Sequence, residues 1–91
     1  MLKTLEVIVR GRVQGVGYRA FAVKNAKKFG IVGYVENLPD GAVKVIAQGE
    51  ENILNFFVRT LKQGPFFSTV KEYAVAEIEH SKDYEDFIVL Y

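Results

Sequence analysis

A change of hydrophobic period that occurs twice is the strongest constraint on how this chain can fold. Apolar and polar residues alternate over residues 4–11, as in a β-strand with one buried face, and then recur at helical spacing over residues 18–29. Further along, a second amphipathic helix is predicted over residues 50–63. Gly30 and the pair Gly64–Pro65 end the two helical patterns. A chain that places two helices between strands must bury both helices against the sheet that those strands form.

Four further strands complete the predicted order of elements. They cover residues 31–37, 42–49, 69–79 and 86–91. The first two are joined by the turn LPDG, residues 38–41, in which proline fixes φ and glycine tolerates a positive φ, so these strands form a hairpin. Imperfect alternation between Val70 and Tyr73 predicts a β-bulge. The order β-α-β-β-α-β-β predicts an α+β fold, the ferredoxin-like α/β sandwich.

The helical periodicity also predicts which side chains are buried. On the first helix, Tyr18, Ala22 and Phe29 share the apolar face. Phe56 on the second helix points away from its apolar face and is expected to be partly exposed. That apolar face is predicted to consist of Ile53, Leu54, Phe57, Val58 and Leu61.

The segment between the first strand and the first helix, residues 11–19, contains three glycines and two arginines. Backbone N–H groups are unpaired at a helix N-terminus, and glycines that turn them inward form a concavity for an anion. Arg19 lies in the first helical turn, where its guanidinium can pair with phosphate oxygens. The spacing G-x-x-x-G-x-G matches neither a P-loop nor a dinucleotide fingerprint. A tight turn with an exposed arginine is therefore the competing interpretation of the same residues.

Length, charge and cysteine content exclude several classes of protein. With 91 residues, the chain is predicted to form one domain over residues 1–91. Its net charge of +1 gives no bulk attraction to nucleic acid or to an anionic membrane. The absence of cysteine excludes disulfides, thiolate catalysis and cysteine-ligated metals. No signal peptide, membrane span or broad leftover apolar face is predicted, so we expect a cytoplasmic monomer.

Two motifs closely resemble the signature segments of the acylphosphatase family. GRVQGVGYR, residues 11–19, resembles the family's G-x-V-Q-G-V-x-aromatic-R segment. GYVENLPDGAV, residues 33–43, resembles its G-aromatic-small apolar-x-N-x-x-x-G-x-V stretch. With QGP at residues 63–65 and the order of the elements, the similarity extends over nearly the whole chain. The resemblance implies two helices on one face of a mostly antiparallel five-stranded sheet.

The resemblance also implies an activity, the hydrolysis of the carboxyl–phosphate bond of a small-molecule acyl phosphate, without a metal or another cofactor. In this sequence it makes Arg19 the phosphate-binding arginine and Asn37 the residue that holds the attacking water. The implied phosphate cradle consists of the backbone amides of Gln14, Gly15, Val16, Gly17 and Tyr18. An acyl phosphate leaves a stable carboxylate behind, so preorganised donors and one arginine can supply most of the catalysis.

Glu36 departs from the family pattern, which has a basic or neutral residue directly before the asparagine. Alternation along a strand sends Glu36 to the face opposite Asn37, so we expect the effect to be small. The only histidine, His80, lies in a polar and acidic segment and is predicted to be a surface residue rather than a metal ligand.

Two other functions remain open at this point. Acylphosphatase-like domains also occur in hydrogenase-maturation factors, so a non-catalytic phosphate-binding or regulatory module is one alternative. The presence of both Arg19 and Asn37 favours a hydrolase over that module. The same fold class includes RNA-binding domains, which stack bases on aromatic residues of the central strands. Residues 5–11 and 43–49 contain no aromatic residue, which argues against RNA.

Overall fold

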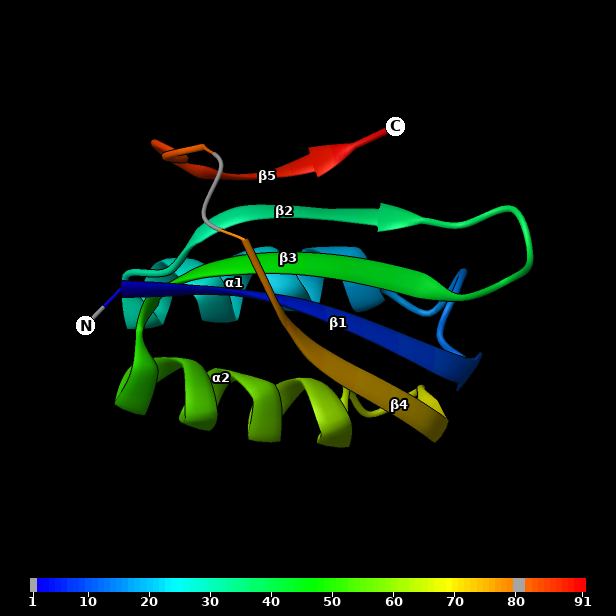
Figure 1. Ribbon diagram of the computed structural model, residues 1–91. Coiled ribbons are helices and arrows are strands. Elements are labelled where there is room, and N and C mark those ends of the chain that lie inside the picture. Colours follow the sequence, from blue (N-terminus) through cyan, green and yellow to red (C-terminus); the bar gives the residue numbers. More distant parts are fainter. Residues whose placement is uncertain (1, 80–81) are drawn as a thin grey trace.

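The computed structural model describes residues 2–79 and 82–91, with two helices packed on one face of a five-stranded sheet (Figure 1). In chain order the elements are β1 (Leu2–Arg12), α1 (Tyr18–Phe29), β2 (Val32–Asn37), β3 (Val43–Glu50), α2 (Glu51–Gln63), β4 (Thr69–Ile78) and β5 (Phe87–Leu90). The strand order is β4-β1-β3-β2-β5, which runs from bottom to top in Figure 1. Only the β2–β5 pair is parallel among the strand pairs of the described residues. The predicted ferredoxin-like fold is therefore confirmed, with strand boundaries that differ from the prediction by a residue or two.

Alternate residues of the three central strands face the helices and form the core. Val7 and Val9 of β1, Val35 of β2 and Val45 of β3 have no solvent-accessible surface. The helices complete this cluster with Tyr18, Ala22, Ala26, Leu54, Phe57, Val58 and Leu61. Burying one large apolar side chain contributes about 1.5–3 kcal/mol, so this cluster is what holds the helices to the sheet.

The buried face of α2 differs from the prediction at one residue. Leu54, Phe57, Val58 and Leu61 are buried, which is the i, i+3, i+4, i+7 stripe of an amphipathic helix. Ile53 was expected on the same face but is 37% exposed, because it is rotated by about 100° from Leu54 and lies at the margin of the stripe.

The predicted turn between β2 and β3 forms as expected. The backbone N–H of Leu38 donates to the carbonyl oxygen of Ala42 at 2.8 Å and closes the turn. Asp40 accepts a hydrogen bond at Oδ1 from the backbone N–H of Ala42 at 3.1 Å. The turn therefore holds the end of β2 next to the start of β3.

The predicted bulge in β4 is also confirmed. Arg10 of β1 pairs with Glu72, whereas Gly11, the next residue, pairs with Val70. Lys71 is left as the extra residue on β4, within the stretch where the alternation of the sequence is imperfect.

Strand directions decide where the functional residues meet. β1 and β2 are both antiparallel to β3, and β5 is parallel to β2, so β1, β2 and β5 all run the same way. Their carboxyl ends lie at one edge of the sheet, and the chain passes from β1 into α1 at this edge. Residues that are far apart in sequence are thereby brought together at the start of α1.

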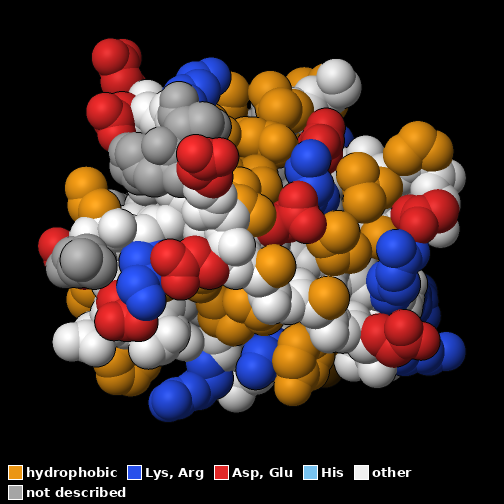
Figure 2. All heavy atoms as spheres, in the orientation of Figure 1, with side chains coloured by type: hydrophobic (Ala, Val, Ile, Leu, Met, Phe, Trp, Pro, Cys, Tyr) orange, Lys and Arg blue, Asp and Glu red, His pale blue; other side chains and the backbone are white. Residues whose placement is uncertain are grey.

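On the face of the molecule that Figure 2 shows, basic and acidic side chains are intermixed, with apolar side chains between them. No helix in residues 2–79 and 82–91 has the length and apolarity needed to cross a membrane. His80 lies outside the described residues, so its surface position stays a prediction.

Candidate active site

The start of α1 presents unpaired backbone donors. Gly17 is the N-cap residue of α1 and has the left-handed conformation, with φ 82° and ψ 17°. Because glycine has no side chain, it offers no oxygen to cap the first N–H groups of the helix. The first helical hydrogen bond runs from the N–H of Phe21 to the carbonyl oxygen of Gly17 at 3.0 Å. The N–H groups of Tyr18, Arg19 and Ala20 precede it and have no partner within the helix. Since the first turn contains no acidic residue, its positive end is available to an anion.

The glycines of the loop are required by its backbone conformation. Gly15 has φ 74° and Gly17 has φ 82°, values that cost other residues about 1–2 kcal/mol. A Cβ atom at either position would meet nothing within 4 Å, so lack of space is not the reason for glycine. The bare loop leaves its backbone exposed to a ligand, as an anion cradle requires.

Arg19 places a cation beside these donors. Its guanidinium carbon lies 5.2 Å from the centroid of the Tyr91 ring, an arrangement typical of a cation–π contact. Within the part of the chain that the structure describes, no carboxylate lies within ion-pair distance of Arg19. Its charge is therefore not already neutralised by an acidic side chain of that part.

Asn37 is the last residue of β2 and pairs with Val43. Val9 pairs with Val43 from the other side, and both valines are fully buried on the face that the helices cover. Asn37 shares that face, and its Oδ1 atom is buried without a hydrogen-bond partner among the described residues. Leaving a buried polar atom unsatisfied costs about 1–3 kcal/mol, which makes Asn37 a candidate functional residue.

The neighbouring charges are paired away from this site. Glu36 lies on the opposite face of β2, as predicted, where its Oε1 is 3.3 Å from Nζ of Lys44. Arg10, near the end of β1, is also paired, because its Nη1 lies 2.6 Å from Oδ2 of Asp40. The reason is tertiary, because the β2–β3 turn extends next to the end of β1.

Arg19, Asn37 and part of the loop line one hollow of about 230 Å³. Its walls are formed by Val13, Gly15, Gly17, Tyr18, Arg19, Ala20, Asn37, Val89 and Tyr91. Pockets for drug-sized ligands are usually larger, about 300–1,000 Å³, so this one suits a small group. Of the seven residues expected at the site, Gln14 and Val16 are not among those that line it.

Val13, Ala20, Val89 and Tyr91 line the hollow without having been predicted. The alternation of Phe87, Val89 and Tyr91 indicated a common face of the last strand. It carried no information on which strand β5 pairs with, and that pairing is what brings Val89 and Tyr91 to Asn37.

Tyr18 has a structural side chain. The ring is 1% exposed, and its hydroxyl donates to the carbonyl oxygen of Leu61 at 2.5 Å. Burial raises the pKa of the Tyr18 hydroxyl well above its ordinary value. Only the backbone of Tyr18 is then available to a cradle.

Among the residues that the structure describes, those that line the hollow include no Asp, Glu or His. Across residues 2–79 and 82–91, no three His, Cys, Asp or Glu side chains are grouped so that they could hold a metal ion.

Comparison with known proteins gives the family. The sequence model of the acylphosphatase family matches residues 5–89. The chain belongs to the acylphosphatase family. An acylphosphatase of Archaeoglobus fulgidus is 49% identical over 89 residues, which cover 96% of this chain and 97% of the relative. This membership confirms the resemblance seen in the two sequence motifs and identifies the chain as an acylphosphatase-type enzyme.

Solved structures agree with the family. The crystal structure of the acylphosphatase from Bacillus subtilis superposes with a TM-score of 0.94 at 41% identity, and each chain covers 100% of the other. A full-length HypF in a phosphate- and nucleotide-bound form superposes with a TM-score of 0.91 at 32% identity. That match covers 99% of this chain but 12% of HypF, so the acylphosphatase fold also occurs as a small part of a longer protein.

Proposed function

We propose that this chain hydrolyses acyl phosphates to a carboxylate and inorganic phosphate, with Arg19 and Asn37 as its catalytic residues. One observation carries the proposal: Arg19, Asn37 and the start of α1 with its unpaired N–H groups line the same small hollow. Among the described residues, no carboxylate lies within ion-pair distance of the Arg19 guanidinium. The relatives named acylphosphatase support the same reaction class.

The phosphoryl group binds at the start of α1. Backbone N–H groups from the segment 14–18 and the Arg19 guanidinium surround its oxygens, and both kinds of donor match a phosphate. In a loose transition state, negative charge spreads over the three equatorial phosphoryl oxygens. Donors already fixed in place stabilise that charge without reorganising, which is the largest catalytic effect available here.

Asn37 positions the attacking water. Its amide oxygen accepts a hydrogen bond from that water and holds it in line with the bond to be broken. The water oxygen bonds to phosphorus as the bond from phosphorus to the acyl oxygen breaks, and the electron pair of that bond leaves with the carboxylate. One proton of the water passes to a phosphoryl oxygen, so no side chain is needed as a base. A cofactor has no part in this scheme.

The test is hydrolysis of benzoyl phosphate by the wild type and by Arg19→Ala and Asn37→Ala, with and without EDTA. We expect turnover that is unchanged by the chelator, and kcat/KM lower by about 10²–10³ in each variant because each loses a fixed transition-state contact. Arg19→Ala should also weaken competitive inhibition by inorganic phosphate, whereas Asn37→Ala should leave that inhibition intact. Loss of turnover in EDTA, or full activity in both variants, would contradict the proposal.

A non-catalytic phosphate-binding module is the second candidate. It is favoured by the structural match to a small part of HypF in its phosphate- and nucleotide-bound form. Titration with inorganic phosphate in a calorimeter separates the candidates. Binding that depends on Arg19, without turnover of benzoyl phosphate, would assign the chain to the module.

We also propose that the enzyme works as a single-domain, cytoplasmic monomer that acts on a small molecule. On the face shown in Figure 2, basic side chains are mixed with acidic ones and form no extended basic surface, which fits a small-molecule substrate rather than nucleic acid. Light scattering should give the mass of one chain, 10.3 kDa, and a dimer mass would contradict this part.

A further inference from the structure

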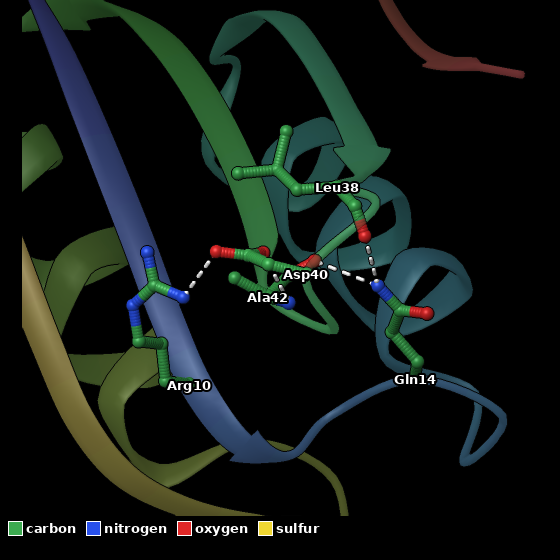
Figure 3. Close-up of polar contacts among 5 residues, drawn as sticks. All are labelled: Arg10, Gln14, Leu38, Asp40 and Ala42. Carbon is green, nitrogen blue, oxygen red and sulfur yellow. Dashed lines mark hydrogen bonds and ion pairs between the residues drawn. The ribbon is translucent and has the colours of Figure 1, made fainter.

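The side chain of Gln14 joins the phosphate loop to the turn that follows Asn37. Its Nε2 donates to the carbonyl oxygens of Leu38 and Ala42, at 2.8 Å in each case (Figure 3). Both hydrogens of the amide group are thereby used. An amide oxygen in the same place would face two carbonyl oxygens and repel them, so only this orientation of the side chain fits.

The two carbonyl groups are also the ones that close the turn. Leu38 accepts at its oxygen from the N–H of Gly41 at 3.1 Å, and Ala42 accepts from the N–H of Leu38 at 2.8 Å. A carbonyl oxygen has two lone pairs, so Gln14 completes the hydrogen bonding of both groups. Its amide is therefore fitted to this turn and has no donor left for a ligand.

The turn in question is next to Asn37 on both strands. Leu38 follows Asn37 directly, and Ala42 directly precedes Val43, the residue that pairs with Asn37. At its other end, Gln14 directly precedes Gly15, which lines the hollow. One side chain therefore links the phosphate loop to the turn beside Asn37.

An ion pair between β1 and the same turn is weaker. Arg10 and Asp40 form an ion pair at 2.6 Å, but their side chains are 46% and 53% exposed. Water screens such a pair, and ion pairs at this exposure contribute little. The Gln14 bonds are partly buried and hold the turn at two points.

We propose that Gln14 is a positioning residue whose side-chain amide holds Asn37 in register with the phosphate cradle. This rests on the proposed hydrolysis and adds to it a role for a side chain that does not line the hollow. Gln14 acts through the turn and touches no reacting atom. The buried oxygen of Asn37 has no hydrogen-bond partner among the described residues that could orient it, so its placement depends on the backbone that carries it.

Gln14→Met tests this, because methionine has a similar shape and no donor. We expect kcat to fall about ten- to a hundredfold, since a small misplacement of a catalytic group costs this much. KM and the inhibition constant of inorganic phosphate should stay within about threefold, because the backbone cradle and Arg19 are unchanged. Gln14→Asn, which keeps the amide but is shorter, should lose kcat as well and decides the matter if the methionine variant does not fold.

The matched control is Gln48→Met. Gln48 is 3% exposed, donates from Nε2 to Thr4 and Lys82, and does not line the hollow. This control should lower the melting temperature without lowering kcat. An equal loss of kcat in Gln48→Met would make the Gln14 effect a consequence of general destabilisation and overturn the proposal.

A double-mutant cycle with Asn37→Ala supplies the decisive result. If Gln14 acts by placing Asn37, adding Gln14→Met to Asn37→Ala should lower kcat by less than about threefold. In the Arg19→Ala background, the full loss should remain. The same loss of kcat in both backgrounds, or none in Gln14→Met alone, would overturn the inference while leaving the proposed hydrolysis intact. An inactive wild type would overturn both.

Discussion

Two buried polar groups near the start of α1 differ in whether they have a hydrogen-bond partner. The Tyr18 hydroxyl donates to Leu61, near the carboxyl end of α2, where the carbonyls of the last turn have no partner within the helix. The Asn37 oxygen has no partner among the described residues. At the scale of single residues, a satisfied group thus joins two helices, and an unsatisfied one belongs to a residue that lines the hollow.

Tyr18→Phe should destabilise the protein without altering the cradle backbone. The Leu61 carbonyl would lose its donor, so we expect the free energy of unfolding to fall by about 1–2 kcal/mol. Urea unfolding at pH 7 measures this. Tyr73→Phe is the control. It removes a hydroxyl group from a side chain that is 53% exposed and should have little effect on the free energy of unfolding.

The same variant should change the response of stability to alkaline pH. Because burial raises the pKa of Tyr18 in the folded protein, the folded state keeps its proton at a pH where the unfolded chain has lost it. This contribution is complete below about pH 10, the pKa of an unperturbed tyrosine, and is lost as the pH rises above it. Above that pH, the stability advantage over Tyr18→Phe should shrink by about 1.4 kcal/mol per pH unit. Parallel pH curves for the two proteins would contradict this.

At the scale of the element, the single apolar stripe of α2 determines which side of the helix packs against the core. Phe57 has no exposed surface and meets Phe87 of β5 edge to face, with ring centroids 6.0 Å apart. Phe56, the preceding residue, is 53% exposed, as its helical position predicts. Two adjacent residues of the same type therefore differ only in the side of the element on which they lie.

The pair provides a test at the scale of the helix. Phe57→Ala should lower the free energy of unfolding by about 3–5 kcal/mol through loss of buried surface and the cavity that remains. Phe56→Ala should change it by less than about 0.5 kcal/mol. Thermal unfolding of both variants by circular dichroism measures the contrast, and similar losses would mean that the face of α2 has been assigned wrongly.

For the whole molecule, the sheet topology decides the chemistry available in the hollow. The carboxyl ends of β1, β2 and β5 and the start of α1 meet there. They supply backbone donors, one guanidinium and one amide, and the described residues of the lining include no Asp, Glu or His. Under the proposed function, catalysis therefore works through fixed donors rather than proton transfer by side chains of the enzyme.

The pH–rate profile of the intact enzyme tests this arrangement. Between about pH 5 and 9, kcat/KM should follow only the ionisation of the substrate phosphoryl group, because an enzyme base would produce a second, bell-shaped dependence. Two acyl phosphates whose phosphoryl groups differ in pKa should shift the profile by that difference. A transition that stays at one pH for both substrates would reveal a titrating enzyme group.

Much of this protein follows from local patterns in the sequence. Alternation, helical spacing and glycines determined the order of elements, the exposure of Phe56 and the bulge at Lys71. They also placed glycines and Arg19 at a helix start, where donors are unpaired whatever the rest of the fold does. These features depend on contacts between residues a few positions apart, and the period of the sequence encodes such contacts directly.

Only the tertiary structure decided which distant segments meet. The pairing of β5 with β2 brings Val89 and Tyr91 to the hollow, and the reach of Gln14 to Ala42 spans 28 positions. The exposure of Ile53 likewise differs from what local patterns predicted, and the pairing of Arg10 with Asp40 spans 30 positions. The physical reason is that strand order is chosen by burying all apolar faces in one core. That choice is a property of the whole chain, which no local period encodes.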